Sequence, residues 1–216
     1  MDRAKVISFD VEGTLVTPQF SRAIWDEAIP ALYARKKGLG LEQAKALIQQ
    51  EYELVGEQRI EWYDIGFWFR HFGLENFPGL LSSQRHQIAL YPEVEGVLST
   101  LRESHKLVIV SSSTREFLDL LLEGIRDYFV GIFSSISDYK ELKTADFYLK
   151  VCERLKVKPE EMAHIGDNWE LDFAIPRQVG IQAFYLDREG KRRDYRAVKD
   201  LKEFLAKFTL SHQGRG

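Results

Sequence analysis

Apolar positions divide the chain into a short first segment, a helical insert and a long alternating segment. Residues 6–9 (VISF) form a compact apolar run that predicts a buried strand, which a turn at Gly13 ends. From about residue 19 to residue 90, apolar positions recur mainly at helical spacing. After Pro92 the pattern alternates between amphipathic helices and short apolar runs, which is typical of a parallel sheet covered by helices.

The insert predicts several helices and no buried strand. Phe20, Ile24 and Ala28 recur every four residues, and Pro30 is expected to interrupt that helix. One apolar face marks the next helix: Leu41, Ala44, Ile48, Tyr52 and Val55. Residues 60–73 are densely aromatic and predict another helix. The insert is therefore expected to be all-helical.

The alternating segment predicts four further strands, at 107–110, 131–133, 163–165 and 183–186. The helices expected around them cover 94–101, a stretch opened by a capping box of Ser113 and Glu116, a stretch after Lys143, 176–179, and a final stretch to about 208. The predicted fold is α/β: a doubly wound, mainly parallel sheet with a small all-helical cap. The core is assigned to residues 1–18 and 88–210, the cap to 19–87, and a flexible tail to 211–216.

Composition narrows the class of protein. A chain of 216 residues with 44% hydrophobic residues can fill one sizeable core, and its net charge of −3 gives no electrostatic footprint for nucleic acid or membrane. The single cysteine, Cys152, is expected to pack in the core, and no apolar run is long enough to span a bilayer. We expect a cytoplasmic monomer or homodimer that acts on a small molecule.

Candidate chemistry begins where the first strand ends. Asp10 stands at the carboxyl end of that strand, the edge where ligands bind in open α/β sheets. Glu12 follows two residues later and can lean toward the same side of an extended segment. A structural strand end followed by an ordinary turn would explain the same residues, so the interpretation depends on the later stretches.

The second stretch, VIVSSST, places hydroxyl groups between a strand and a helix. Free backbone N–H groups and the positive end of a helix dipole favour an anion there, and Ser111 can donate a further hydrogen bond. Ser111 and Ser112 are therefore candidate phosphate-binding residues. Ser113 is better explained as a helix cap.

The third stretch offers a cation. A lysine at the start of a core helix can be a solvated surface charge, as Lys140 close by can be. A site that holds several carboxylates and a dianionic phosphate nevertheless needs a fixed cation. Lys143 is the candidate for that role, as a catalytic and phosphate-binding residue.

The fourth stretch, GDNWELD, supplies two more carboxylates. Asp167 follows a predicted strand directly, and Asp172 lies five residues further on. Together with Asp10 and Glu12 they would repel one another in a shared crevice unless a cation lay among them. Carboxylates at strand ends suit a hard divalent ion, so Mg²⁺ is the expected cofactor.

In this order, the four stretches resemble the motifs of the haloacid dehalogenase-like (HAD) superfamily. The resemblance covers residues 4 to about 187, with the insert in the position of that family's cap. It implies that Asp10 attacks a phosphate ester and becomes an aspartyl phosphate. It also implies that Mg²⁺ is bound by Asp10, the backbone carbonyl of Glu12 and Asp167, with Asp172 supporting the site through water or from behind the direct ligands.

One residue departs from the family pattern. Phosphatases of this family usually carry aspartate where this chain has Glu12, whose carboxyl group keeps the acid/base chemistry with a longer reach. DVEGT is similar to the DIEGT of enolase-phosphatases, and 2-haloacid dehalogenases are a further alternative. Glu12, Asp167 and Lys143 favour phosphate chemistry over dehalogenation. A catalytically inactive binding subunit is the alternative from a different class.

Substrate specificity is expected to lie in the cap. The aromatic side chains of residues 60–73 are interpreted mainly as cap core or as the surface that closes on the sheet. Arg70 and His71 are the exceptions that could contact substrate. We expect the cap to open and close over the site.

Overall fold

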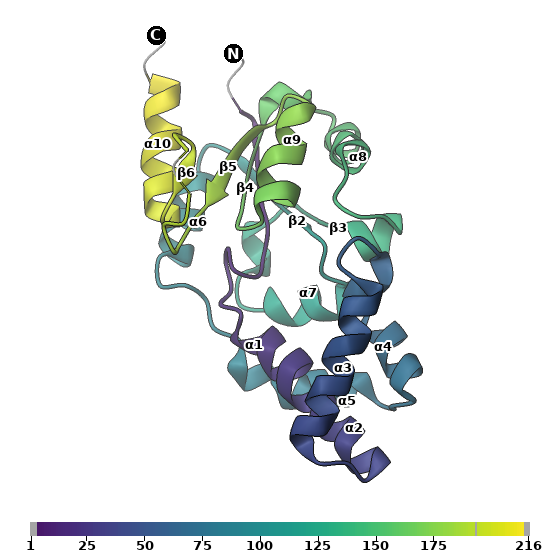
Figure 1. Ribbon diagram of the computed structural model, residues 1–216. Helices are drawn as coiled ribbons and strands as arrows, with labels where there is room; N and C mark the ends of the chain where they lie inside the picture. The colour runs from purple at the N-terminus through teal and green to yellow at the C-terminus, as the bar shows by residue number, and fades with distance from the viewer. Residues whose placement is uncertain (1–3, 193, 214–216) are drawn as a thin grey trace.

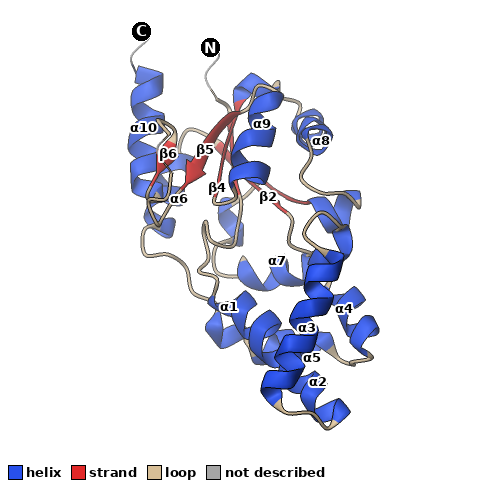
Figure 2. Ribbon diagram, in the orientation of Figure 1, coloured by secondary structure: helices blue, strands red, loops and turns tan. Residues whose placement is uncertain are grey.

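A six-stranded, all-parallel sheet forms the centre of the computed structural model, which describes residues 4–192 and 194–213 (Figures 1 and 2). Its strand order is β3-β2-β1-β4-β5-β6. The strands are β1 (Val6–Phe9), β2 (Lys106–Ser111), β3 (Gly131–Ser134), β4 (Met162–Gly166), β5 (Gln182–Leu186) and β6 (Ala197–Val198). The predicted α/β fold is confirmed, and the short edge strand β6 was not predicted.

Both faces of the sheet are buried because side chains alternate along each strand. Ile7 and Phe9 point into the larger hydrophobic cluster, which includes α10, whereas Val6 points into a second cluster with Phe147 and Val151 of α8. Cys152 is buried in that second cluster, as expected. The residue that follows Val6 and Ser8 in this alternation is Asp10, which therefore lies on the α8 side of the sheet.

Helices cover the sheet and build the cap. The core helices are α6 (Val94–Arg102), α7 (Arg115–Leu121), α8 (Ala145–Leu155), α9 (Ile175–Gln178) and α10 (Leu201–Gln213). The cap helices are α1 (Gln19–Arg22), α2 (Ile29–Lys37), α3 (Leu41–Val55), α4 (Ile65–Phe72) and α5 (Phe77–Ser83). Figure 1 shows α1 to α5 gathered at one end of the molecule, beyond the edge of the sheet. Of the described helices, none is long and apolar enough to cross a bilayer.

Pro30 does not break the first cap helix, contrary to the sequence prediction. Residues 23–28 form a π-helical turn between α1 and α2, in which the Ile29 N–H donates to the carbonyl of Ile24, five residues back. This wider turn relieves the clash between a proline ring and the preceding carbonyls, so the helix continues to Lys37.

Two antiparallel connections join the cap to the core. The Thr17 N–H donates to the Ala89 carbonyl at 2.8 Å, and the Tyr91 N–H donates to the Leu15 carbonyl at 3.1 Å. The chain thus enters and leaves the cap at one place. The predicted boundaries at 18/19 and 87/88 stay a prediction.

One further expectation about helix ends was wrong, the cap at Ser113, and another, the flexible tail, stays a prediction. The helix α7 begins at Arg115 and follows Thr114, so Ser113 is not the cap of α7. By contrast, the Thr144 side chain does cap α8. The Arg115 N–H is satisfied from another element, by Ser137 Oγ at 2.9 Å, which makes a local cap unnecessary. At the carboxyl end, α10 continues to Gln213 because no glycine or proline stops it sooner, so residues 211–213 are helical. Residues 214–216 of the expected tail lie outside the described residues.

Candidate active site

Because the strands are parallel, the candidate residues lie together at the carboxyl ends of the strands. Phe9 is in register with Ile109 of β2 and with Ile165 of β4, so the residues that follow these strands lie side by side. Asp10 follows β1, Ser111 ends β2, and Asp167 follows β4. The Asp10 N–H donates to the Ile165 carbonyl at 3.0 Å, which fixes the backbone of Asp10 beside β4.

Lys143 is buried among carboxylates, as predicted for the fixed cation of the site. Its side chain is only 2% exposed, and Nζ donates to Asp10 Oδ1 at 2.9 Å and also to Asp172 Oδ1. Burial alone would lower the pKa of Lys143, but the charges on Asp10 and Asp172 raise it well above its usual value. The lysine is therefore a permanent positive charge between two carboxylates.

Three aspartates form an acidic centre around this lysine. Ligand atoms of Asp10, Asp167 and Asp172 all lie within 4.8 Å of one another. Burial raises the pKa of Asp10, and desolvation together with the charges on the other two aspartates raises the pKa of Asp167 to about 8. Burial would also raise the pKa of Asp172, but Lys143 and His164 hold it below its usual range.

Two glycines allow this close approach. A Cβ on Gly13 would lie 2.0 Å from Asp167 Oδ2, and Gly13 has a φ of +74° that L side chains rarely adopt. A Cβ on Gly166 would lie 2.4 Å from the carboxyl carbon of Asp172. The sequence showed these residues as turn and strand-end glycines. Their further role is to leave room for the carboxylates.

Glu12 lies beside the acidic centre with one carboxyl oxygen unpaired. Burial raises the pKa of Glu12 to about 7, against the opposing effect of the nearby hydroxyls of Ser21 and Ser113. Neither hydroxyl makes a well-formed hydrogen bond to Glu12 Oε1, which is buried without a partner among the described residues. At neutral pH, Glu12 is poised to give or take a proton.

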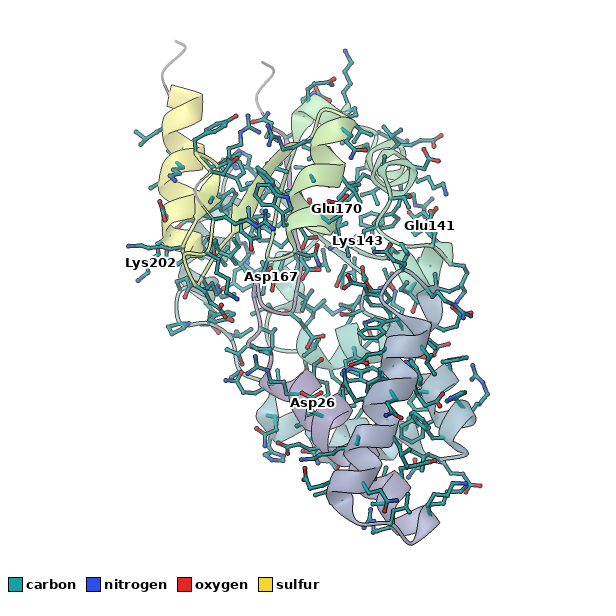
Figure 3. The ribbon with its side chains drawn as sticks, in the orientation of Figure 1. Asp26, Glu141, Lys143, Asp167, Glu170 and Lys202 are labelled. Carbon is teal, nitrogen blue, oxygen red and sulfur yellow. The ribbon has the colours of Figure 1, made fainter. Side chains whose placement is uncertain are left out.

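A cavity of about 250 Å³, which we call the inner cavity, opens onto these groups. Asp10, Lys143 and Asp167 line it, as do Ser111 and Ser112. Within the described residues, the buried Ser112 hydroxyl has no hydrogen-bond partner and is free to bind an anion. Figure 3 shows Lys143 and Asp167 at the end of the sheet that faces the cap.

The Ser111 hydroxyl oxygen accepts a hydrogen bond within its own turn. Ser111 Oγ accepts a hydrogen bond from the Ser113 N–H at 3.2 Å. One of the backbone N–H groups expected to hold an anion is therefore occupied, and the Ser111 hydroxyl proton remains available for donation.

His164 is a site residue that the sequence reasoning missed. It is fully buried in β4, with Nδ1 2.7 Å from Ser8 Oγ and Nε2 3.1 Å from Asp172 Oδ1. Burial lowers the pKa of His164, so its ring is neutral. The sequence does show a polar residue within an apolar run, two positions before Gly166 and therefore on the same side of the strand. His164 orients Asp172, which in turn holds Lys143.

A second cavity of about 290 Å³ lies between the cap and α7, and we call it the aromatic cavity. Its walls are six rings: Trp25, Tyr52, Trp62, Tyr63, Trp68 and Phe117. Asp26, Gln49 and Thr114 add polar groups. Four residues line both cavities: Glu12, Trp62, Tyr63 and Ser113.

The other aromatic and basic residues of α4 lie elsewhere. Phe69 and Phe72 are buried in the hydrophobic core, as expected for cap packing. Arg70 lies 3.7 Å from Asp64, His71 lies 2.8 Å from Glu51, and neither lines the two cavities. Arg70 and His71, the two residues of this segment that could have contacted substrate, therefore lie away from the site.

Arg188 fixes the turn that carries Glu12. Its guanidinium donates to the carbonyls of Gly13 at 3.1 Å and Thr14 at 2.9 Å, and it pairs with Glu93 at 2.8 Å. It also lies 3.4 Å from the ring centroid of Tyr91. The segment after β5 thereby holds both the turn after β1 and the end of the cap connection. No pattern in the sequence indicates this contact.

The parallel sheet, the strand-end carboxylates and the buried lysine define a hydrolase site of the phosphoryl-transfer type. The family model of haloacid dehalogenase-like hydrolases matches residues 4–180. The chain belongs to this family, which confirms the resemblance seen in its motifs.

Solved structures and curated proteins agree with this assignment. A HAD phosphatase from Thermococcus onnurineus is 27% identical, with a TM-score of 0.81 over 94% of this chain and 96% of that chain. The glyceraldehyde 3-phosphate phosphatase of Methanopyrus kandleri is 24% identical over 91% of this chain and 89% of its own length. The GMP/IMP nucleotidase of Escherichia coli is 26% identical over 69 residues, and the chain spans 31% of its length.

Proposed function

We propose that the chain is a Mg²⁺-dependent phosphatase that hydrolyses a small phosphorylated metabolite through an aspartyl phosphate. The observation that supports it most is the buried contact of Lys143 with both Asp10 and Asp172 in a cavity that Ser112 also lines, whose hydroxyl has no partner among the described residues. One relative is named a GMP/IMP nucleotidase and another a glyceraldehyde 3-phosphate phosphatase, and both names support the same class of reaction.

The acidic centre fits a divalent cation. Burial, together with repulsion among three carboxylates within 4.8 Å, raises the pKa of Asp10 and of Asp167, and a bound cation would relieve that repulsion. Asp10, Asp167 and the Glu12 carbonyl would hold Mg²⁺. Asp172 would act indirectly, because Oδ1 faces Lys143 and His164 and Oδ2 accepts from the Asn168 N–H. Bound Mg²⁺ supplies positive charge that offsets repulsion between Asp10 and the phosphate.

The reaction uses Asp10 as nucleophile and Glu12 as proton carrier. An Asp10 oxygen attacks phosphorus and the ester P–O bond breaks, while Lys143, Ser111 and Ser112 stabilise the phosphate oxygens. Protonated Glu12 donates its proton to the departing alcohol oxygen. Ionised Glu12 then takes a proton from water, which attacks the phosphorus of the aspartyl phosphate and restores Asp10.

Substitution of the nucleophile tests the proposal. Asp10→Asn keeps the size of the side chain and leaves Lys143 paired with Asp172, so the fold should survive while turnover of p-nitrophenyl phosphate with Mg²⁺ is abolished. Asp119→Asn, an exposed aspartate on α7, is the matched control and should keep wild-type activity. Near wild-type turnover by Asp10→Asn would remove Asp10 from this role.

The alternatives give different outcomes in the same assay. A dehalogenase would release halide from 2-haloacids without added metal, and an inactive binding subunit would hydrolyse no phosphate ester. Glu12, Asp167 and Lys143 favour the phosphatase, because two acids and a cation in one centre suit metal-assisted phosphate transfer. The cytoplasmic location, the small-molecule partner and the monomeric or homodimeric state stay predictions.

A further inference from the structure

We propose that the substrate's leaving alcohol carries a flat aromatic ring with uncharged or cationic polar substituents, and that this ring occupies the aromatic cavity. This inference rests on the proposed phosphatase function and names its substrate class. It is supported by the position of the cavity, by its walls, by its unpaired hydroxyls and by its charge.

Position links the aromatic cavity to the departing oxygen. Glu12, Trp62, Tyr63 and Ser113 line both this cavity and the inner cavity, so the two meet at the Glu12 carboxyl group. With phosphorus at Asp10 in the inner cavity, an alcohol that receives its proton from Glu12 extends into the aromatic cavity. The remainder of a leaving group that extends in this direction must suit these walls.

The walls favour a flat ring. Six aromatic side chains surround about 290 Å³, a volume that suits one substituted ring. They also support one another: Trp25 stacks on Phe117 at 5.8 Å, and Tyr52 meets Trp68 edge-on at 4.6 Å. Side chains held in this way offer ring faces and edges at fixed positions, which favours an aromatic ligand over a flexible aliphatic one.

Two residues that line this cavity have buried hydroxyls without a partner among the described residues. The structure provides no hydrogen bond within the described residues for Tyr52 Oη or Thr114 Oγ1, although Tyr52 is 8% and Thr114 4% exposed. A buried hydroxyl left without a hydrogen bond is costly, so such groups usually face a ligand or water. The ring is therefore expected to carry polar substituents that reach them.

Charge excludes an anionic ring. Asp26 and Glu12 are the charged groups of the cavity, and among its described lining residues there is no lysine, arginine or histidine. A carboxylate or second phosphate on the leaving group would meet acidic side chains without a compensating cation. Figure 3 shows Asp26 on the cap side of the molecule, across from Lys143 and Asp167.

Three phosphate esters of primary alcohols test the ring and its charge. They are 2-(4-hydroxyphenyl)ethyl phosphate, with an uncharged polar ring, ethyl phosphate, with no ring, and 4-(2-phosphooxyethyl)benzoate, with an anionic ring. We expect kcat/KM for the hydroxyphenyl ester to exceed that for ethyl phosphate by roughly tenfold or more, mainly through KM. The benzoate ester should lose this advantage. Equal kcat/KM for all three esters would overturn the substrate class alone. No hydrolysis of any ester would overturn the proposed function as well.

A charge reversal tests the role of Asp26. Asp26→Lys should raise kcat/KM for the benzoate ester relative to the hydroxyphenyl ester by roughly tenfold. Glu27→Lys changes the net charge equally at the next position, which is exposed and outside the cavity, and should leave that ratio unchanged. The same ratio in both variants would contradict the charge argument.

The unpaired hydroxyl gives a test that separates binding from folding. Because Tyr52 Oη has no partner among the described residues, Tyr52→Phe should leave the thermal unfolding temperature unchanged or slightly raised. Its kcat/KM for the hydroxyphenyl ester should fall roughly fivefold, with no change for 2-phenylethyl phosphate. Equal losses for both esters, or a lower unfolding temperature, would make the hydroxyl structural and contradict the inference.

Discussion

Glu12 has one methylene more than the aspartate usual at this position in phosphatases that resemble this chain. The longer side chain brings its carboxyl group to the junction of the inner and aromatic cavities, where its Oε1 is unpaired. Burial there raises the pKa of Glu12 to about 7, so both protonation states are populated near neutral pH. The residue can thus serve as acid and then as base in one turnover.

This role predicts a dependence on the leaving group. Glu12→Gln should slow hydrolysis of ethyl phosphate by roughly 100-fold or more, because an alkoxide needs a proton to depart. The kcat/KM for p-nitrophenyl phosphate should fall much less, because p-nitrophenolate leaves without one. The comparison uses kcat/KM from steady-state kinetics, since kcat also includes the later step in which Glu12 activates water. Glu57→Gln, an acid that lines the inner cavity away from the junction, is the control, and equal losses of kcat/KM on both esters would contradict the assignment.

Individual site residues were predictable where residue type and position agreed. Asp10 and Asp167 follow apolar runs directly, and a carboxylate at a strand end has few structural explanations. Lys143 followed from the charge balance that several carboxylates require. His164 was not predictable, because a neutral buried histidine acts through its contacts with Ser8 and Asp172, which no sequence pattern records.

At the scale of elements, the turn after β1 is the tightest part of the site. Gly13 has a positive φ, its backbone is held by Arg188, and the Asp167 carboxylate occupies the space where a Cβ would lie. A substitution in this turn therefore moves a functional group on a different element.

Gly13→Ala should strongly reduce catalysis while the chain stays folded. The added methyl group must displace the Asp167 carboxylate, and we expect kcat/KM to fall roughly 100-fold. Gly38→Ala is the matched control: Gly38 also has a positive φ, of +65°, but nothing lies within 4 Å of its Cβ position. Both variants should lose about 1–2 kcal/mol of unfolding free energy from backbone strain. Unchanged activity in Gly13→Ala would show that Asp167 can move freely.

Periodicity predicted most elements, and the errors have physical causes. β6 is two residues long, which is too short for an alternating pattern. Residues 26–30 (DEAIP) and 172–176 (DFAIP) share four of five residues, and a π-helical turn precedes the proline in both. A proline therefore interrupts a helix only if the preceding turn cannot widen, which tertiary packing decides.

For the whole molecule, the folded state holds three carboxylates together, and this repulsion opposes folding. A ligand that binds only the folded state stabilises it by mass action. Mg²⁺ at 100 times its dissociation constant should thus add about 2.7 kcal/mol and raise the unfolding temperature by roughly 5–10 °C.

Two variants sharpen this measurement by thermal unfolding with and without Mg²⁺. Without metal, Asp167→Asn should be more stable than wild type. Burial and the neighbouring aspartates raise the pKa of Asp167 to about 8, which costs folding free energy above the ordinary aspartate pKa, and asparagine does not carry that cost. The variant should also lose the Mg²⁺ shift. Asp119→Asn should keep the full shift. A full shift in Asp167→Asn would place the cation elsewhere.

The connectivity of the sheet has a consequence for synthesis on the ribosome. Of the described strands, β1 is the first to be translated, yet Val6 pairs with Lys106 and Met162, which are translated much later. Until then the apolar segment VISF has no neighbouring strand, whereas the helices of residues 19–87 need only local contacts to begin forming. The nascent chain must therefore shelter one side of its central strand from aggregation until β2 has been made, and the other side until β4 has been made.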